Sequence, residues 1–203
     1  ESNTPWRKNP KAASEVPTAL EDVGVTEHLG ENVDLGLSFK NEAGEDVTLG
    51  KYFDGRRPVL LSLVYYGCPG LCNFHLNGVT EVLKGLDWSL GKEFDMVVIS
   101  IDPSEGADLA TGKKQTHVTE LGRAEAAKGW HFLTGTQENI QKIAQQVGFK
   151  YQWDKVSKQW AHTAAMYVLS PQGKLSRYLY GIQFEPKTLR LSLVEASEGK
   201  TGS

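Results

Sequence analysis

The feature that most constrains the fold is an apolar run that leads directly into a pair of cysteines. Residues 59–66 read VLLSLVYY and lie between Pro58 and Gly67. A short apolar run bounded by proline and glycine is typical of a strand buried on both faces in the middle of a sheet. Cys68 and Cys72 follow at once, and leucine and valine then recur at helical spacing. The cysteines are therefore predicted to lie at a strand-to-helix junction.

The remaining hydrophobic patterns predict strands that alternate with helices early in the chain and a hairpin late. We expect a β-hairpin at 34–49, strands at 95–101, 130–133, 164–169 and 174–180, and helices at 108–123, up to Gly148, and from Pro186 onward. The polar stretch 154–160 is predicted to be a loop. The pattern as a whole predicts an α/β fold with a mixed central sheet, an N-terminal β-hairpin and flanking helices.

The length and composition indicate one folded domain. The chain has 203 residues, of which 39% are hydrophobic, enough for one substantial core. Residues 1–33 are polar, contain three prolines and show no apolar periodicity, so we expect a tether or peripheral segment without a role in the core. The domain is predicted to span 34–197, with a short tail at 198–203.

Charge and hydropathy exclude two classes of protein. The 22 Lys and Arg against 25 Asp and Glu give a net charge of −3, without the basic excess that nucleic-acid binding requires. The longest apolar run is far shorter than the roughly 20 residues of a membrane-spanning helix. The chain begins at Glu1, which suggests a processed product, so a signal peptide or membrane anchor is expected upstream of the sequence given.

The two cysteines are too few to build a disulfide scaffold, and a reactive or metal-binding pair is the better hypothesis. Residues i and i+4 of a helix share a face, so Cys68 and Cys72 are expected to direct both sulfurs at one ligand. A helix N-terminus favours thiolate, and paired thiolates select a soft ion such as Cu(I). A structural disulfide, two inert buried thiols and a zinc site remain as alternatives, although structural zinc prefers four protein ligands.

A third ligand is sought among the five histidines. His75 follows Cys72 by three positions and Cys68 by seven, so an ideal helix places all three on one face. The alternative for His75 is a solvent-facing helix residue. His162 precedes a predicted strand, in a loop that is able to fold over the cysteines; its alternative is a surface histidine. The other three, His28, His117 and His131, are expected to be solvated or merely packed.

Several longer motifs together resemble the Sco/SenC family over about residues 35–196. The matching segments are 65–73 after the buried strand, 100–103 after the next strand, 148–151 after a helix, and His162 ahead of 167–174. The Cys-Pro-x-x-Cys element alone is moderately specific. Its combination with the downstream histidine and with the Asp-Pro and Pro-x-Gly-Lys motifs is much more so.

The resemblance implies a thioredoxin-like domain that binds copper, as Cu(I), Cu(II) or both, through two cysteines and one histidine. By motif position the ligands are Cys68, Cys72 and His162 rather than His75. The implied role is a metallochaperone that assembles the dinuclear copper site of cytochrome c oxidase. Its implied partners are the copper-site subunit of that oxidase and other copper chaperones or thiol oxidoreductases. The implied location is the periplasm or the outer face of the inner membrane.

Two positions depart from the family pattern. The Asp-Val that often stands inside the cysteine motif is Gly70-Leu71 here, and the acidic residue often found before the family histidine is Ala161. A carboxylate that would orient the imidazole of His162 is therefore missing. For this reason we expect the segment 154–161 to be mobile without metal and ordered with it.

Two other function classes are retained. A thiol-disulfide oxidoreductase would use one cysteine to attack a partner disulfide and the other to resolve the mixed disulfide. Three residues separate these cysteines instead of two, and no proline lies between Trp153 and Ser170, where thioredoxin-type enzymes place one. A peroxiredoxin-like peroxidase ranks last, because Tyr65 stands where that family requires Thr or Ser.

Overall fold

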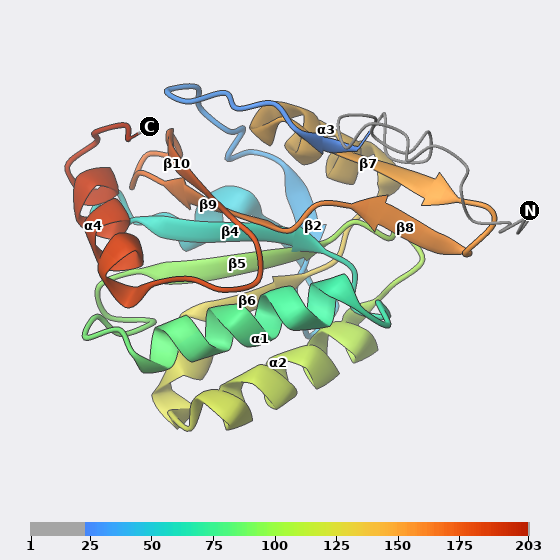
Figure 1. Ribbon diagram of the computed structural model, residues 1–203, viewed down its shortest axis with the longest axis horizontal. Helices are drawn as coiled ribbons and strands as arrows, with labels where there is room; N and C mark the ends of the chain where they lie inside the picture. Colours follow the sequence, from blue (N-terminus) through green and yellow to red (C-terminus); the bar gives the residue numbers. More distant parts are fainter. Residues whose placement is uncertain (1–22, 203) are drawn as a thin grey trace, which may run out of the picture.

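The structure, a computed structural model, describes residues 23–202 and centres on a mixed five-stranded sheet (Figure 1). In spatial order its strands are β10 (Leu175–Tyr180), β9 (Ala165–Leu169), β4 (Val59–Val64), β5 (Asp95–Ser100) and β6 (Trp130–Leu133). Strands β4, β5 and β6 run parallel, whereas β9 is antiparallel to both β4 and β10. This topology confirms the predicted α/β class with a mixed sheet.

Within residues 23–202, four α-helices surround the sheet: α1 (Leu71–Lys84), α2 (Ala107–Leu121), α3 (Gln137–Val147) and α4 (Pro186–Ser197). Figure 1 shows α1 and α2 side by side along one face of the sheet and α3 beyond the other face. The 3-10 helices η2 (Leu49–Tyr52) and η3 (Ala124–Lys128) lie in the connections. Within residues 23–202, no helix is both long and apolar enough to cross a membrane.

The central strands are buried on both faces, as their sequence predicts. All six residues of β4 and all six of β5 are buried. Strand β4 pairs with β5 on one side and with β9 on the other, so its backbone is held on both edges. The loop that follows β4, which carries Cys68, therefore starts from a rigid point of the molecule.

The predicted hairpin near the N-terminus is present. Strands β2 (Ser38–Lys40) and β3 (Asp46–Thr48) pair antiparallel, with Phe39 opposite Val47 on the buried side. The turn between them uses Gly44 at a φ of 77°, a left-handed conformation that glycine adopts without strain.

The predicted loop at 154–160 is shorter than expected: residues 155–158 form the turn of a second hairpin, whereas Asp154, Gln159 and Trp160 belong to its strands. Strands β7 (Phe149–Asp154) and β8 (Gln159–His162) pair antiparallel. The turn is ordered by the carboxylate of Asp154, which accepts hydrogen bonds from the Val156 amide and the Ser157 hydroxyl. The ring of Trp160 lies edge-on to Trp153 at 5.2 Å, and such cross-strand aromatic pairs stabilise a hairpin that is otherwise polar.

The predicted domain boundary at residue 34 was also wrong for the part that is described. Strand β1 (Gly24–Val25) pairs with β7, and Val33 is buried in the core. The domain therefore begins upstream of Asp34; residues 1–22 of the predicted tether lie outside the described residues. At the other end, the Gly202 amide donates to the carbonyl of Ser176, so the predicted tail is attached to β10.

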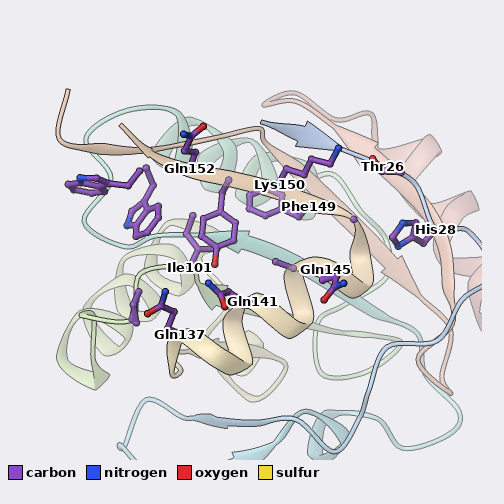
Figure 2. A pocket seen from close by; sticks show the side chains of 15 residues that line it. Thr26, His28, Ile101, Gln137, Gln141, Gln145, Phe149, Lys150 and Gln152 are labelled. Atoms are coloured by element: carbon purple, nitrogen blue, oxygen red, sulfur yellow. The ribbon is translucent and has the colours of Figure 1, made fainter. Parts of the chain in front are cut away.

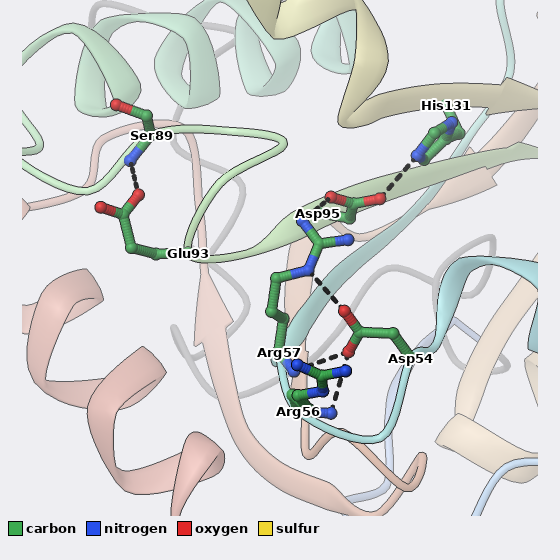
Figure 3. A network of polar contacts seen from close by, with 7 residues as sticks. All are labelled: Asp54, Arg56, Arg57, Ser89, Glu93, Asp95 and His131. Carbon is green, nitrogen blue, oxygen red and sulfur yellow. Dashed lines mark hydrogen bonds and ion pairs between the residues drawn. The ribbon is translucent and has the colours of Figure 1, made fainter.

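An ion network joins the N-terminal ends of the central strands, opposite the cysteine loop. Figure 3 shows the Asp95 carboxylate between Arg57 and His131, with both oxygen-to-nitrogen distances at 2.9 Å. Arg57 also pairs with Asp54 at 2.8 Å. The Asp95 side chain is only 7% exposed, so its charge depends on these partners.

We expect Asp95→Asn to lower the free energy of unfolding by about 2 kcal/mol, because it leaves Arg57 partly buried without its better-shielded partner. Urea unfolding monitored by circular dichroism measures this change. Asp46→Asn, which breaks an exposed pair with Lys40, is the matched control and should cost under about 1 kcal/mol. Equal losses in the two variants would show that burial of Asp95 contributes nothing.

Candidate metal and thiol site at the β4–α1 junction

The cysteines lie at a strand-to-helix junction, as predicted, but they do not share a helix. Helix α1 begins at Leu71, and its N-cap Gly70 has a non-helical backbone with φ −145° and ψ −104°. Cys68 therefore lies in the loop between β4 and α1, whereas Cys72 is the second residue of the helix. The prediction that Cys68, Cys72 and His75 line one helical face was wrong, because only the last two belong to α1.

Cys72 occupies the first helical turn, where backbone N–H groups lack partners within the helix and the helix dipole favours negative charge. Both effects favour thiolate at this position. Cys68 is buried, with 6% of its surface exposed, and its amide donates to the carbonyl of Tyr65 at 3.3 Å. The loop is thus a tight turn that leaves a central strand and enters a helix.

The carboxylate of Glu105 holds the start of the cysteine loop. Glu105 lies in the turn between β5 and α2 and accepts hydrogen bonds from the amides of Tyr66 and Gly67, each at 2.7 Å. It also accepts the hydroxyl of Ser100 at 2.6 Å. Sequence analysis missed this residue, since nothing local links it to the cysteines. Knowledge that β4 and β5 are parallel neighbours would have placed both turns at the same edge of the sheet.

A second polar contact holds the other side of the loop. The side-chain amide of Asn73 donates to the carbonyl of Cys68 at 2.8 Å, and its oxygen accepts the ammonium of Lys113 at 2.7 Å. Lys113 lies on α2, which packs beside α1. Hydrogen bonds therefore connect the cysteine loop to α2 and to the turn that precedes α2. Neither connection was predicted from the sequence.

His162 is the last residue of β8 and lies next to the cysteine loop. Its ring is edge-on to that of Tyr65, three residues before Cys68, with centroids 5.8 Å apart. At 9% exposure it is not the surface histidine considered above. Its Nδ1 lies 2.8 Å from the carbonyl oxygen of Thr163. Because a carbonyl only accepts, Nδ1 donates to it, and Nε2 is the ring nitrogen that would bind a metal.

This contact replaces the carboxylate that is missing at Ala161. An imidazole is usually oriented at a metal by a carboxylate or a backbone carbonyl on its other nitrogen. Here the Thr163 carbonyl, one residue along the chain, has that position. The departure from the family pattern at Ala161 therefore does not leave the ring of His162 without an orienting group.

His75 is a core residue rather than a solvent-facing one. It is fully buried, with Nε2 3.0 Å from the Ser62 hydroxyl on β4 and Nδ1 2.9 Å from the carbonyl of Gly181. Burial, together with the nearby His162, lowers its pKa to about 4 in spite of the Gly181 contact, so it is neutral at pH 7. Both nitrogens are engaged in hydrogen bonds, so His75 does not offer the free lone pair that a metal ligand needs.

The remaining histidines are packed away from the cysteines. His117 is buried against Thr80, His131 pairs with Asp95, and His28 contacts the carbonyl of Gln146. Among the side chains that the structure describes, which do not include that of Cys72, no group of three His, Cys, Asp or Glu residues is arranged to hold a metal.

A large cavity lies elsewhere. It has a volume of about 760 Å³ and separates α3 from the β7–β8 hairpin. Figure 2 shows Gln137, Gln141 and Gln145 of α3 along one wall. The cavity includes neither cysteine nor His162, although it lies close to His162: Phe149 lines it and has its ring 6.0 Å from that of His162, and Tyr151 lines it and pairs with His162 across the hairpin. The cavity therefore lies apart from the cysteines.

Comparison with solved structures gives the same fold. The chain is similar to a putative electron transfer protein from Aquifex aeolicus, with a TM-score of 0.74 and 20% identity over 85% of this chain and 95% of that one. It is also similar to Arabidopsis thaliana ScoI with copper bound, with a TM-score of 0.62 and 20% identity over 84% and 99%. BsSco, described as a Sco-family cytochrome c oxidase assembly protein with a disulfide switch, gives 0.65 and 20% over 85% and 97%.

These similarities confirm the thioredoxin-like fold. No curated protein matches the chain. The SCO1/SenC family model matches residues 30–195, well over half of the sequence and all of the elements that build the cysteine junction. The chain therefore belongs to the SCO1/SenC family.

Proposed function

We propose that this protein is a copper metallochaperone that carries copper on Cys68, Cys72 and His162 and delivers it to the dinuclear copper site of cytochrome c oxidase. Family membership supports the general role, and copper is bound in the solved ScoI proteins of Arabidopsis thaliana and Bradyrhizobium japonicum. The acceptor is the copper-site subunit of the oxidase. Other copper chaperones or thiol oxidoreductases exchange metal or electrons with the same cysteines.

The observation that carries the proposal is the orientation of His162. Its Nδ1 is engaged by the Thr163 carbonyl, while its ring packs against Tyr65 at the base of the cysteine loop. Tyr65 leads into the loop that carries Cys68, and this loop ends at α1, whose second residue is Cys72. Two thiolates and one imidazole are a soft ligand set, which suits copper better than Mg²⁺ or Ca²⁺, and three ligands leave room for ligand exchange with an acceptor.

The proposed location is the periplasm or the outer face of the inner membrane. A cysteine pair that alternates between dithiol and disulfide is suited to an oxidising compartment, where disulfides persist. Metal is carried by the reduced pair, so a compartment that oxidises thiols also requires a partner to reduce them.

The second candidate function is a thiol-disulfide oxidoreductase. It is favoured by the position of Cys72 in the first turn of α1, where the helix dipole stabilises a thiolate. In this reaction a thiolate attacks a partner disulfide, and the second cysteine then displaces the partner from the mixed disulfide. The peroxidase alternative has no comparable support, since Tyr65, whose ring packs against His162, stands in the position where a peroxiredoxin needs Thr or Ser.

The test compares copper binding by the reduced and oxidised protein. Reduced protein given one equivalent of Cu(II) should show thiolate-to-copper charge-transfer absorption, because both sulfurs bind the metal. Oxidation to a Cys68–Cys72 disulfide should abolish the absorption, and reduction should restore it, because metal and disulfide compete for the same thiolates. An unchanged spectrum after oxidation would refute sulfur ligation; reduction of a partner disulfide without copper binding would favour the oxidoreductase.

A further inference from the structure

Two side chains of opposite charge hold the two ends of the cysteine loop. The Glu105 carboxylate accepts the amides of Tyr66 and Gly67, just before Cys68. The Lys113 ammonium donates to Asn73, whose amide in turn donates to the carbonyl of Cys68. Both charges come from the segment that joins β5 to α2 and continues into that helix.

The carboxylate is fixed in place rather than free to turn away. Its Oε1 accepts the Tyr66 amide and the Ser100 hydroxyl, while its Oε2 accepts the Gly67 amide. A Cβ atom at Gly67 would lie 3.1 Å from Oε2, closer than nearly all real contacts of this kind. A side chain at position 67 would therefore require the carboxylate to move by a few tenths of an ångström.

We propose that Glu105 and Lys113 are positioning residues that set the reduction potential of the Cys68–Cys72 pair in opposite directions. The inference rests on the proposed function, in which the two cysteines form one redox-active, copper-binding pair. Neither residue touches the substrate copper; each acts through the loop that it holds.

The reaction concerned is thiol-disulfide exchange with a dithiol such as dithiothreitol. Two electrons pass from dithiothreitol to the Cys68–Cys72 disulfide, whose S–S bond breaks. The dithiothreitol sulfurs close into a ring disulfide, and their two protons pass to the reduced cysteines or to water. The reduced pair carries negative charge as thiolate, which the oxidised pair does not. A neighbouring carboxylate therefore disfavours the reduced state, and a neighbouring ammonium favours it.

The opposite signs separate this effect from simple loosening of the loop. Loss of the hydrogen bonds of either residue loosens the loop, and loosening is expected to shift the reduction potential in the same direction for both residues. Loss of the charges is expected to shift the reduction potential in opposite directions, since Glu105→Gln removes a negative charge and Lys113→Met removes a positive one. Ser100→Ala weakens the hold on the Glu105 carboxylate but keeps its charge, so it reports on loosening alone.

The experiment equilibrates the full chain with dithiothreitol buffers at pH 7 and measures the dithiol fraction by thiol labelling and mass. Glu105→Gln should shift the equilibrium about tenfold toward dithiol and Lys113→Met about tenfold toward disulfide, each equivalent to about 30 mV. The double variant should return close to wild type. Glu93→Gln is the matched control, because Glu93 also caps a loop by accepting the Ser89 amide at 2.7 Å, at the opposite end of the sheet (Figure 3).

Shifts of the same sign in Glu105→Gln and Lys113→Met, or a shift of similar size in Ser100→Ala or Glu93→Gln, would overturn the inference. If Glu105→Gln does not fold, the direction of the shift in Lys113→Met tests the inference alone. That variant is expected to fold, because the Lys113 side chain is half-exposed. Unshifted variants of a wild type that binds copper reversibly would refute this inference and leave the proposed function standing. A wild type with no reversible cysteine couple and no copper binding would refute both.

Discussion

Replacing either Cys68 or Cys72 by serine is expected to lower the affinity for Cu(I) by more than about a hundredfold. Even groups that only orient the ligands of a metal site typically contribute 10- to 100-fold to affinity, so loss of a ligand should cost more. A serine hydroxyl is a hard oxygen that stays protonated at neutral pH, and Cu(I) prefers soft thiolates. Competition with a chromophoric Cu(I) chelator measures the affinities directly.

The two variants are matched in chemistry but not in surroundings. Cys68 is buried in the loop, so Cys68→Ser also buries a hydroxyl and is expected to lower stability by about 1 kcal/mol. Circular dichroism establishes that each variant is folded before its affinity is compared. Ser104→Ala, an exposed change in the turn between β5 and α2, serves as the control and should keep the wild-type affinity. Wild-type affinity in either cysteine variant would refute a two-sulfur site.

The local signals of the sequence were enough to predict the central strands and the cysteine junction. The apolar run at 59–66 is typical of a strand in the middle of a sheet, where both faces are buried. Strand β4 has this position, and all six of its residues are buried. The helix that follows was predicted from its leucine spacing. Its start was not predicted correctly. Gly70 is the N-cap, so Pro69 and Gly70 lie between Cys68 and the first helical residue, Leu71.

The hairpin that carries His162 could not be predicted from local polarity. Its strands are exposed along much of their length, so they lack the apolar alternation that predicts a half-buried strand. They are stabilised by aromatic contacts between Tyr151, Trp153 and Trp160, which only pairing brings together. The resemblance to a family singled out His162 as a ligand candidate, whereas local helix geometry favoured His75.

Contacts between distant segments explain the other differences. Helical spacing predicts that His75 shares a face of α1 with Cys72. It does not predict which segment of the chain covers that face. Gly78 allows the chain at Ile182 to pass so close to α1 that any side chain there would overlap the Ile182 carbonyl. This approach brings the Gly181 carbonyl to His75 and buries the ring. The same lack of long-range information hid Glu105 from sequence analysis.

Replacement of His75 is therefore expected to lower stability, whereas replacement of His162 is expected to lower copper affinity. His75→Ala should lower the free energy of unfolding by about 3 kcal/mol, because it removes a buried ring and leaves the Ser62 hydroxyl and the Gly181 carbonyl without that partner. The folded fraction should bind copper with nearly wild-type affinity. His162→Ala should lower copper affinity at least about tenfold and change the absorption spectrum, with a smaller loss of stability.

Acid titration gives a second readout for His75. Burial lowers the pKa of His75 and of His117 to about 4, from 6.5 in the unfolded chain. The unfolded state therefore binds two more protons than the folded state between these values, and stability should fall as pH decreases from 6.5 to 4. His75→Phe keeps the ring volume but cannot take up a proton, so it should reduce this difference from two protons to one.

Urea unfolding at several pH values and chelator competition at pH 7 measure the two histidines side by side, with His162→Phe as the volume-matched partner of His75→Phe. We expect the free energy of unfolding to respond to His75 and the copper affinity to respond to His162. The reverse outcome, in which His75→Phe loses copper while His162→Phe keeps it, would mean that the ring of His75 leaves Ser62 and Gly181 to bind the metal. Helix α1 would then supply two of the three ligands, and the β7–β8 hairpin would have no part in the site.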